Sequence, residues 1–576
     1  MNTLVIVLIA AVVLVCAYAG YGRWLAKTWG VDPNAKTPAV RLEDGKDYVP
    51  TNGWTVFAHQ FSSIAGAGPV TGAIQAAAFG WLPVLLWVLI GGVFFGAVTD
   101  FGALYASVKN DGKSMGLLIE KYIGKTGRKL FLLFCWLFCG IVIAAFADMV
   151  AGTFNAFDAE GAPVEAAFTN GAAGMVSIMF MVFAVVFGFI QKKFNFSGWR
   201  EAVIGIVFIV LSFVVGMNCP LVFGKAAWSY ITFVYIFFAA VLPMWMLKQP
   251  RDYMTTFMFG AMIAGAVIGL LVAHPTMNLP VFTGFNNAKL GTMFPILFVT
   301  VACGAVSGFH SLVSSGTSSK TVENEKDMLK VGYGAMVLES LLAVLALCVA
   351  GAAAAADGTP ATGTPFQIFS RGVAGFFEMF GVPVSIATVF MTMCVSALAL
   401  TSLDAVARIG RMSFQELFSV DDMEHAEGWR KLCCNVYFST FITLVFGFIL
   451  TQIGYANIWP LFGSANQLLS ALVLATLCVF LKVTGRNNKM LFPPLVIMLC
   501  VTFTALVQRL IAMVKAISAA ASTAIPAGET TWGAVFIANG LQLILAVLLI
   551  VLGLNIVFHS VKSYTTCDAP EAKVTV

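Results

Sequence analysis

The chain has 576 residues, of which 59% are hydrophobic and only 11% are charged, and its mean hydropathy is +0.90. This composition excludes a soluble globular protein and indicates a polytopic membrane protein. We attribute the net charge of +5 to basic loops in contact with anionic lipid, not to a nucleic-acid surface.

The apolar segments predict the helices in chain order. A bilayer core about 30 Å thick requires roughly 20 apolar residues for each spanning helix. We therefore predict an all-α fold with about fifteen transmembrane helices. A further segment, 361–380, is predicted to form an interfacial or re-entrant helix. The spans are 3–25, 54–79, 81–108, 130–155, 171–190, 200–222, 227–247, 252–273, 291–315, 328–352, 382–407, 432–452, 456–481, 490–513 and 531–558.

Basic residues fall almost entirely in alternate connections. Short loops rich in Lys and Arg stay in the cytoplasm, so the N-terminus is predicted outside and the C-terminus inside. Arg23 and Lys27 follow the first apolar run, which is opposite to the secretory pattern, so residues 1–25 are predicted to remain as a peripheral anchor helix. All but five of the 33 Lys and Arg residues obey this division; the exceptions are Lys225, Lys289, Arg371, Arg509 and Lys515.

Residues 1–576 are predicted to form a single transmembrane domain, because no extramembrane stretch is long enough to build its own core. Its core is expected within 54–481. Residues 490–558 are predicted as accessory C-terminal helices and 559–576 as a cytoplasmic tail. Most of the 12 cysteines lie in apolar segments or on the reducing side, so no disulfide framework is predicted.

Two predicted helices contain Gly, Ser and Pro where a spanning helix normally has Leu and Ile. They are residues 59–69 in the second span and 303–316 in the ninth. Gly lowers helix stability and Pro removes a backbone donor, so both helices are predicted to be discontinuous. Backbone groups freed in this way survive at membrane depth only within protein or beside a cavity.

The loop charges orient these two spans in opposite directions. Paired interrupted helices of inverted orientation indicate a secondary transporter, in which half-helix N-termini face an anionic group of the solute. The alternative is that small residues only allow close helix packing, as we expect at Gly92, Gly96, Gly265 and Gly269.

Several motifs in these segments resemble those of the carbon starvation protein A (CstA) family. They are spread from the connection before the second span to the thirteenth span. Family members often carry His-His where this chain has His59-Gln60, which puts in doubt any role that needs two imidazoles. The motifs are Asp47-Tyr48-Val49-Pro50-Thr51-Asn52, Ile64-Ala65-Gly66-Ala67-Gly68-Pro69, Gly96-Ala97-Val98 with Asp100-Phe101, Ser307-Gly308-Phe309-His310-Ser311, Ser314-Ser315-Gly316-Thr317, Thr401-Ser402-Leu403-Asp404 and Leu461-Phe462-Gly463-Ser464-Ala465-Asn466-Gln467-Leu468-Leu469.

The resemblance implies a LeuT-like core of five-helix inverted repeats, as in the amino acid-polyamine-organocation carriers. It also implies uptake of short peptides or pyruvate during carbon starvation. With the residue patterns, it predicts an importer of the cytoplasmic (inner) membrane that works by alternating access and is driven by protons.

The candidate solute-binding residues lie in the two discontinuous segments and in the thirteenth span. Gly and Ser groups would contact a solute carboxylate, and the two histidines are expected to share a polar centre with nearby amides. For the histidines and amides, the alternative is hydrogen-bonded packing between helices. The set is His59, Gln60, Ser62, Ser63, Gly66, Ala67, Gly68, Ser307, Gly308, His310, Ser311, Ser314, Asn466 and Gln467.

Four carboxyl groups inside predicted spans are candidates for ion coupling: Asp100, Asp148, Glu339 and Asp404. A charge at the centre of a membrane helix costs about 2.5–3.5 kcal/mol on insertion scales, so such residues are functional candidates. The coupling ion is expected to be a proton, with sodium as the alternative. A structural role is the other reading for each; for Asp404 it is a salt bridge to Arg408, one helical turn later.

Enzyme motifs are weak. Gly112-Lys113-Ser114 matches only part of a phosphate loop and follows a membrane helix, and the chain has no zinc-protease or serine-hydrolase motif. We predict no enzyme activity and no cofactor, and we leave a metal site undecided because no close zinc-type spacing occurs. The expected partners are a small solute, a proton or sodium and lipid, without nucleic acid. Alternatives are a sodium-coupled amino-acid symporter, a channel and a solute sensor.

Overall fold

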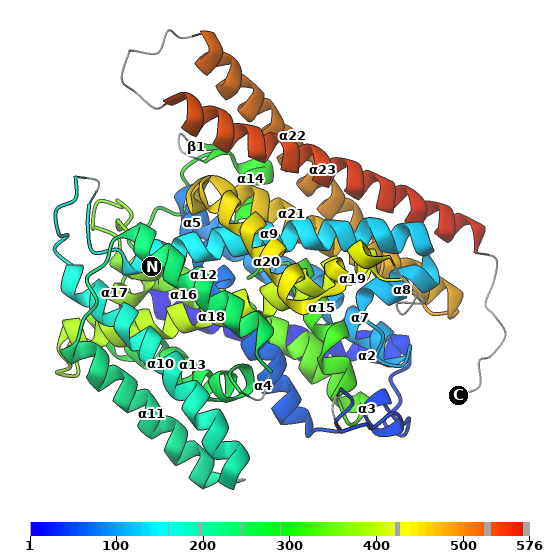
Figure 1. The fold of residues 1–576 in the computed structure, drawn as a ribbon, viewed down its shortest axis with the longest axis horizontal. Helices are drawn as coiled ribbons and strands as arrows, with labels where there is room; N and C mark the ends of the chain where they lie inside the picture. The colour runs from blue at the N-terminus through cyan, green and yellow to red at the C-terminus, as the bar shows by residue number, and fades with distance from the viewer. Residues whose placement is uncertain are drawn as a thin grey trace.

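The protein is described by a computed structural model that covers residues 2–45, 47–158, 160–194, 198–243, 246–287, 290–420, 427–522 and 531–567. These residues are mainly helical (Figure 1). The helices of the first half are α1 (Thr3–Ala17), α2 (Arg23–Trp29), α3 (Pro38–Arg41), α4 (Gly53–Ile64), α5 (Ala67–Ala76), α6 (Trp81–Gly91), α7 (Ala97–Val108), α8 (Met115–Tyr122), α9 (Lys125–Phe154), α10 (Ala167–Phe194), α11 (Trp199–Asn218), α12 (Lys225–Val241) and α13 (Lys248–Ala273).

A two-residue antiparallel hairpin, β1 (Asn286–Asn287) and β2 (Gly291–Thr292), opens the second half. π-helical turns join α1 to α2 at Tyr18–Gly22, precede α7 at Gly92–Gly96 and precede α16 at Leu329–Gly334. The later helices are α14 (Met293–Thr300), α15 (Gly308–Gly316), α16 (Ala335–Ala353), α17 (Pro365–Glu378), α18 (Val384–Phe418), α19 (Gly428–Cys434), α20 (Val436–Thr451), α21 (Tyr455–Val483), α22 (Phe492–Ser522) and α23 (Thr531–Thr566).

Eleven helices in the described part of the chain are long and apolar enough to cross a membrane, and the bent pair of α19 and α20 raises that number to twelve. Three of the fifteen predicted spans correspond to shorter or interrupted helices. The span at 227–247 is the 17-residue α12, while those at 54–79 and 291–315 are the pairs α4–α5 and α14–α15. The protein is therefore a polytopic helical membrane protein with fewer continuous spans than the apolar runs predict.

The segment predicted as an interfacial or re-entrant helix contains α17. Thr364 caps this helix: its side chain accepts a hydrogen bond from the Gln367 amide, and the Gln367 side chain accepts one from the Thr364 amide. Residues 365–378 are too few to span a bilayer. In Figure 1, α17 lies near the end of the bundle opposite to α3 and α8.

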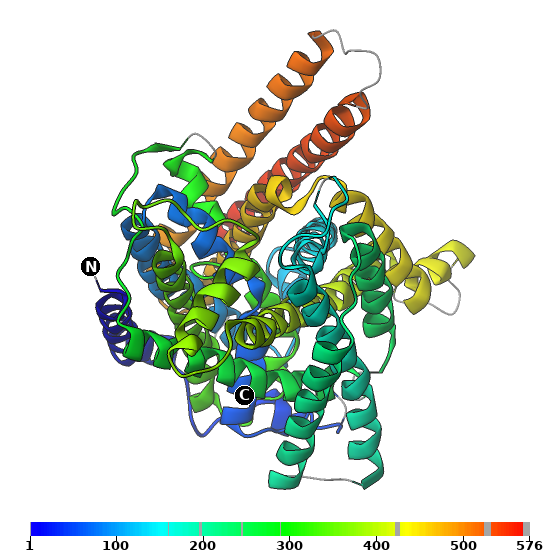
Figure 2. The ribbon, with the colours of Figure 1, turned by 90° about the vertical axis from the view of Figure 1, so that its left-hand side faces the viewer.

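Burial separates central helices from peripheral ones. The most apolar 18-residue window of α21 is entirely buried, whereas only 17% of the corresponding window of α11 is buried. Apolar side chains such as Val203, Val207 and Val210 on α11 are exposed, which is the pattern of a surface that faces lipid. In both views α10 and α11 extend from one side of the body, and α22 and α23 extend from another (Figures 1 and 2).

The last helix, α23, continues to Thr566, past the predicted end of the fifteenth span at 558. The predicted cytoplasmic tail, 559–576, therefore begins as helix, and its residues 568–576 lie outside the described part. Lys289, one of the exceptions to the charge division, also lies outside it.

Candidate functional site

The chain is interrupted in both segments that are rich in small residues. Between α4 and α5, Ala65 and Gly66 leave the helical conformation, and Pro69 follows in the first turn of α5, where its missing N–H costs little. Between α14 and α15, residues 301–307 are not helical, and Ser307 is extended. Each interruption leaves a helix N-terminus inside the protein.

Glycines bring the two interruptions against each other. A Cβ on Gly68 would lie 2.4 Å from Cys303 Sγ, and one on Gly72 would lie 2.6 Å from the Thr300 carbonyl oxygen. On the opposite side, a Cβ on Gly304 would contact Ala343 and Pro69. Close packing and interruption are thus not alternatives here, because the same glycines provide both. Gly92, Gly96, Gly265 and Gly269 are also at close helix contacts.

The freed carbonyls of α14 accept hydrogen bonds from three side chains on two other helices, α6 and α21. Trp87 Nε1 and Gln467 Nε2 donate to the Phe298 carbonyl at 3.3 and 2.6 Å, and Trp459 Nε1 donates to the Thr300 carbonyl at 3.2 Å. These donors satisfy backbone groups that lipid could not. Gln467, predicted as a solute contact, therefore supports the backbone of the ninth span.

A small cavity of about 20 Å³ lies where the interruptions meet. This volume suits roughly one water molecule. The lining comes from both interruptions and from α9, α15, α18 and α21. It consists of Ile64, Gly66, Gly68, Phe138, Val142, Phe146, Cys303, Phe309, His310, Ser402, Val406, Phe462 and Asn466.

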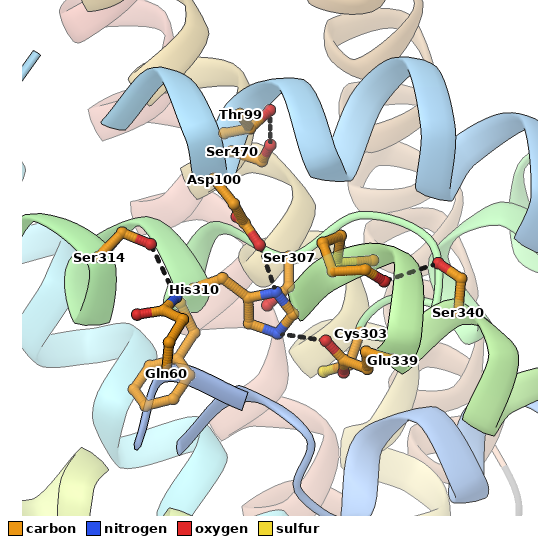
Figure 3. Close-up of polar contacts among 12 residues, drawn as sticks. Gln60, Thr99, Asp100, Cys303, Ser307, His310, Ser314, Glu339, Ser340 and Ser470 are labelled. Carbon is orange, nitrogen blue, oxygen red and sulfur yellow. Dashed lines mark hydrogen bonds and ion pairs between the residues drawn. The ribbon is translucent and has the colours of Figure 1, made fainter. Parts of the chain in front are cut away.

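His310 lies in the cavity wall and also between two carboxyl groups (Figure 3). Its Nδ1 is 3.0 Å from Asp100 Oδ2 on α7, and its Nε2 is 3.4 Å from Glu339 Oε2 on α16. The three side chains are at most 1% exposed. We call Asp100, His310 and Glu339 the His310 cluster.

The His310 cluster is incompletely satisfied. Among the described residues, Asp100 Oδ1 and both Glu339 carboxyl oxygens have no hydrogen-bond partner. No lysine or arginine in the same part of the chain forms an ion pair with the cluster. Buried carboxylates without a fixed cation are costly, so the charge of this cluster depends on its bound protons.

The remaining polar residues of the interruptions form local networks. Gln60 Nε2 donates to Ser314 Oγ at 2.8 Å, and Ser318 Oγ donates to Gln60 Oε1 at 2.6 Å. Asn466 Oδ1 accepts from the Phe309 amide at 3.1 Å and so caps α15. Its Nδ2 donates to Ser307 Oγ at 3.0 Å.

Other predicted contacts are buried close to the interruptions. Ser62 Oγ bonds the His59 carbonyl of its own helix, and Ser311 Oγ has no hydrogen-bond partner among the described residues. Gly308 packs against the α21 backbone, where its Cβ would lie 2.6 Å from the Asn466 carbonyl. Ser63 and Ala67 are also buried.

The expectation that His59 and His310 share one polar centre is wrong. The charged neighbours of His59 are Lys248 and Asp252 on α13, and His59 does not line the cavity. The imidazole lies on α4 before the interruption, whereas His310 follows the interruption of the ninth span. The residue that departs from a His-His pair is Gln60, which bonds Ser314, one turn after His310 on α15.

The structural alternative for Asp404, a salt bridge to Arg408, is wrong in its partner. Asp404 Oδ2 pairs with the Arg251 guanidinium and accepts a hydrogen bond from the Tyr235 hydroxyl at 2.9 Å. Arg408 Nη2 donates instead to the Leu242 carbonyl, at 2.8 Å. Arg251, Asp404 and Tyr235, from α13, α18 and α12, form what we call the Arg251 cluster.

Asp148, near the C-terminal end of α9, has two partners. Its Oδ1 is 2.8 Å from Lys225 Nζ, and its Oδ2 accepts from the Tyr455 amide, in the first turn of α21, at 2.8 Å. A carboxylate at a helix N-terminus is stabilising. Of the four predicted coupling carboxyls, the structure therefore brings only Asp100 and Glu339 together.

No group of three or more His, Cys, Asp or Glu side chains suited to a metal ion occurs in the described part of the chain. A larger cavity, of about 530 Å³, is lined by the end of α16, by α17, including Arg371, and by the connections at 275 and 361–362. None of its lining residues belongs to the interruptions. The candidate site is therefore the cavity with the His310 cluster.

Interrupted membrane helices that enclose polar groups are typical of membrane transport proteins. The chain belongs to the family described as carbon starvation protein CstA, whose family model matches residues 2–362 and 351–505.

Relatives support this assignment. The chain is 31% identical to the peptide transporter CstA of Escherichia coli, over 88% of this chain and 80% of that protein, and 30% identical to the Bacillus subtilis peptide transporter CstA, over 85% and 87%. It is 36% identical to the pyruvate/proton symporter BtsT of Escherichia coli, over 61% of this chain and 49% of that protein. These names point to a transporter rather than an enzyme, and the protein is a multi-pass inner-membrane protein.

Among solved structures, a manganese transporter of Eremococcus coleocola aligns over 91% of this chain and 99% of its own. The TM-score is 0.45 and the sequence identity 12%. A likeness this weak supports no inference about fold, ion or solute.

Proposed function

We propose that the protein is a proton-coupled secondary importer of short peptides, amino acids or pyruvate that works by alternating access. It acts in the inner membrane during carbon starvation, with its N-terminus outside and its C-terminus in the cytoplasm. The observation that carries this proposal is the cavity at which the N-termini of α5 and α15 meet.

The chemistry of the cavity favours an anionic group. Each half-helix N-terminus carries roughly half a positive charge, and His310 and Asn466 add hydrogen-bonding groups. None of the lining residues is Asp or Glu. This chemistry favours a solute carboxylate between Gly66, Gly68 and His310, as in other carriers with interrupted helices. The cavity described here holds about one water molecule, so the carboxylate would bind in a conformation of the transport cycle in which the cavity is wider.

The order of elements supports a LeuT-like inverted-repeat core. An interrupted helix is followed by a π-helical turn, a helix with one buried carboxyl, a short helix and a long helix. This order occurs from α14 to α18, with Glu339. It also occurs from α4 to α9, with Asp100, where the additional helix α6 lies between the interrupted helix and the π-helical turn. The two halves thus place their carboxyls on either side of His310.

The test is uptake by purified protein in liposomes. Labelled pyruvate and labelled dialanine are offered under an inward proton gradient alone and a sodium gradient alone. We expect saturable accumulation of at least one solute above its outside concentration under the proton gradient. Accumulation under sodium alone identifies a sodium symporter. Flux that does not saturate or accumulate identifies a channel, and binding without flux identifies a sensor.

A second experiment tests the cavity. A Cβ on Gly66 would lie 2.1 Å from Ser402 Oγ and 3.3 Å from Ser402 Cβ. Gly66→Ala should therefore reduce uptake by about tenfold or more, and adding Ser402→Ala should restore much of it. Gly260→Ala, at a position with no atom within 4 Å of the new Cβ, is the matched control. Full uptake by Gly66→Ala contradicts the placement of the site.

A further inference from the structure

His310 is common to two parts of the site. It lines the cavity, and its two ring nitrogens face Asp100 and Glu339. The other titratable group against the two carboxyls is the Cys303 thiol, which also lines the cavity. A charge that enters the cavity therefore lies beside the imidazole and changes how strongly the cluster holds protons.

The number of protons fixes the charge of the cluster. Two carboxyls and one imidazole carry a net charge of −2 with no titratable proton, −1 with one and zero with two. The N-termini of α5 and α15 together supply roughly one positive charge. When the cavity is empty, this positive charge balances the charge of −1 on a cluster that holds one proton. When a solute carboxylate occupies the cavity, it balances the carboxylate, because a cluster that holds two protons is neutral.

We propose that Asp100, His310 and Glu339 act as one proton site that gains a single proton when a monoanion occupies the neighbouring cavity. This inference rests on the proposed function. The total charge between the interrupted helices is then the same in the empty and the loaded protein. One proton enters with each monoanion, and transport moves no net charge. His310 links the two events because it contacts both the cavity and the carboxyls.

The wild-type protein in liposomes provides the first test. Labelled pyruvate, a monoanion at neutral pH, is offered under a pH gradient of about one unit, with the membrane potential set by potassium and valinomycin. One proton per pyruvate predicts about tenfold accumulation, equal at 0 and about −100 mV. Accumulation that changes with the potential overturns the inference. Uptake of dialanine without uptake of pyruvate also overturns it but leaves the proposed function standing.

The second test removes the negative charge of the cluster. Asp100→Asn combined with Glu339→Gln leaves His310 but no group that can carry the charge of the empty site. We expect exchange of labelled for unlabelled pyruvate to persist, while accumulation under the pH gradient falls about tenfold, to equality. Tenfold accumulation by this variant overturns the inference. If exchange is lost as well, the wild-type measurement decides: equal accumulation at the two membrane potentials supports the inference, and unequal accumulation overturns it.

The matched control combines Asp357→Asn with Glu323→Gln. Both side chains are exposed, and an Asn side chain can still accept from the Thr359 amide as Asp357 does. This control should accumulate pyruvate like the wild type. Loss of accumulation in the control would show that any pair of neutralised carboxyls has this effect, which would also overturn the assignment to the cluster.

Discussion

The protein buries two ionic clusters that differ in their cation. In the Arg251 cluster, a guanidinium that keeps its proton under all ordinary conditions faces Asp404. In the His310 cluster, an imidazole, which exists in both a neutral and a protonated form, faces two carboxyls. The charge of Arg251 is constant and holds three helices together, whereas the charge of the His310 cluster changes with its bound protons. We therefore expect the partner of a buried carboxyl, and not its burial alone, to distinguish a coupling carboxyl from a structural one.

The largest effect on stability should come from Asp404→Asn. This change removes the fully buried carboxylate that faces Arg251 and leaves only the longer contact, 3.3 Å, with Asp252. We expect a loss of about 3–5 kcal/mol in the free energy of unfolding. Unfolding in mixed detergent micelles by titration with dodecyl sulfate measures it. Asp357→Asn, in an exposed loop, serves as the control and should change little.

Replacement of the imidazole should have a smaller effect. His310→Gln removes the contact between Nδ1 and Asp100, and we expect a loss of about 1–3 kcal/mol in the free energy of unfolding. The same titration with dodecyl sulfate measures this loss. A loss as large as that of Asp404→Asn would mean that His310 is a fixed cation like Arg251.

Removing both charges of the Arg251 cluster tests its structural role. Arg251→Met with Asp404→Leu should be only about 1–2 kcal/mol less stable than the wild type, because both charges of the pair are removed together. The remaining cost comes from Tyr235, which loses one acceptor, and from Asp252, which loses its contact of 3.3 Å with Arg251 Nη2. A double variant as unstable as Asp404→Asn would show that the pair itself, and not the unpaired charge, determines stability.

The smallest effect on stability is expected for Glu339→Gln. The Glu339 oxygens have no hydrogen-bond partner in the described part of the protein, so the amide should change the free energy of unfolding by less than about 1 kcal/mol. Heating curves of the purified variant in detergent provide an independent measure. A loss comparable to that of Asp404→Asn would abolish the distinction between the two clusters.

Composition and local pattern predicted much of the fold. The apolar content predicted a polytopic membrane protein, and Gly, Ser and Pro marked the segments where α4–α5 and α14–α15 are interrupted. The apolar runs did not show which spans are continuous, because hydropathy does not report the bend between α19 and α20 or the short length of α12.

The partners of the buried charges were beyond the sequence. The Arg408 expectation considered only a neighbour one turn away, whereas Arg251 lies 153 positions from Asp404 and had been counted among the loop cations. Likewise, no local pattern places Glu339 beside His310 or Tyr235 beside Asp404. The spacing of Asp100 and Glu339 behind their interrupted helices was a usable signal, since it repeats between the two halves.

The indole donors on the freed carbonyls of α14 provide natural spectroscopic reporters. Trp87 and Trp459 each donate a hydrogen bond to the backbone that ends at the interruption, so movement of that backbone must change the surroundings of both rings. In a variant that keeps only these two of the 12 tryptophans, intrinsic fluorescence or ¹⁹F resonances from fluorinated tryptophan would therefore report on this backbone during the proposed transport cycle without an attached dye.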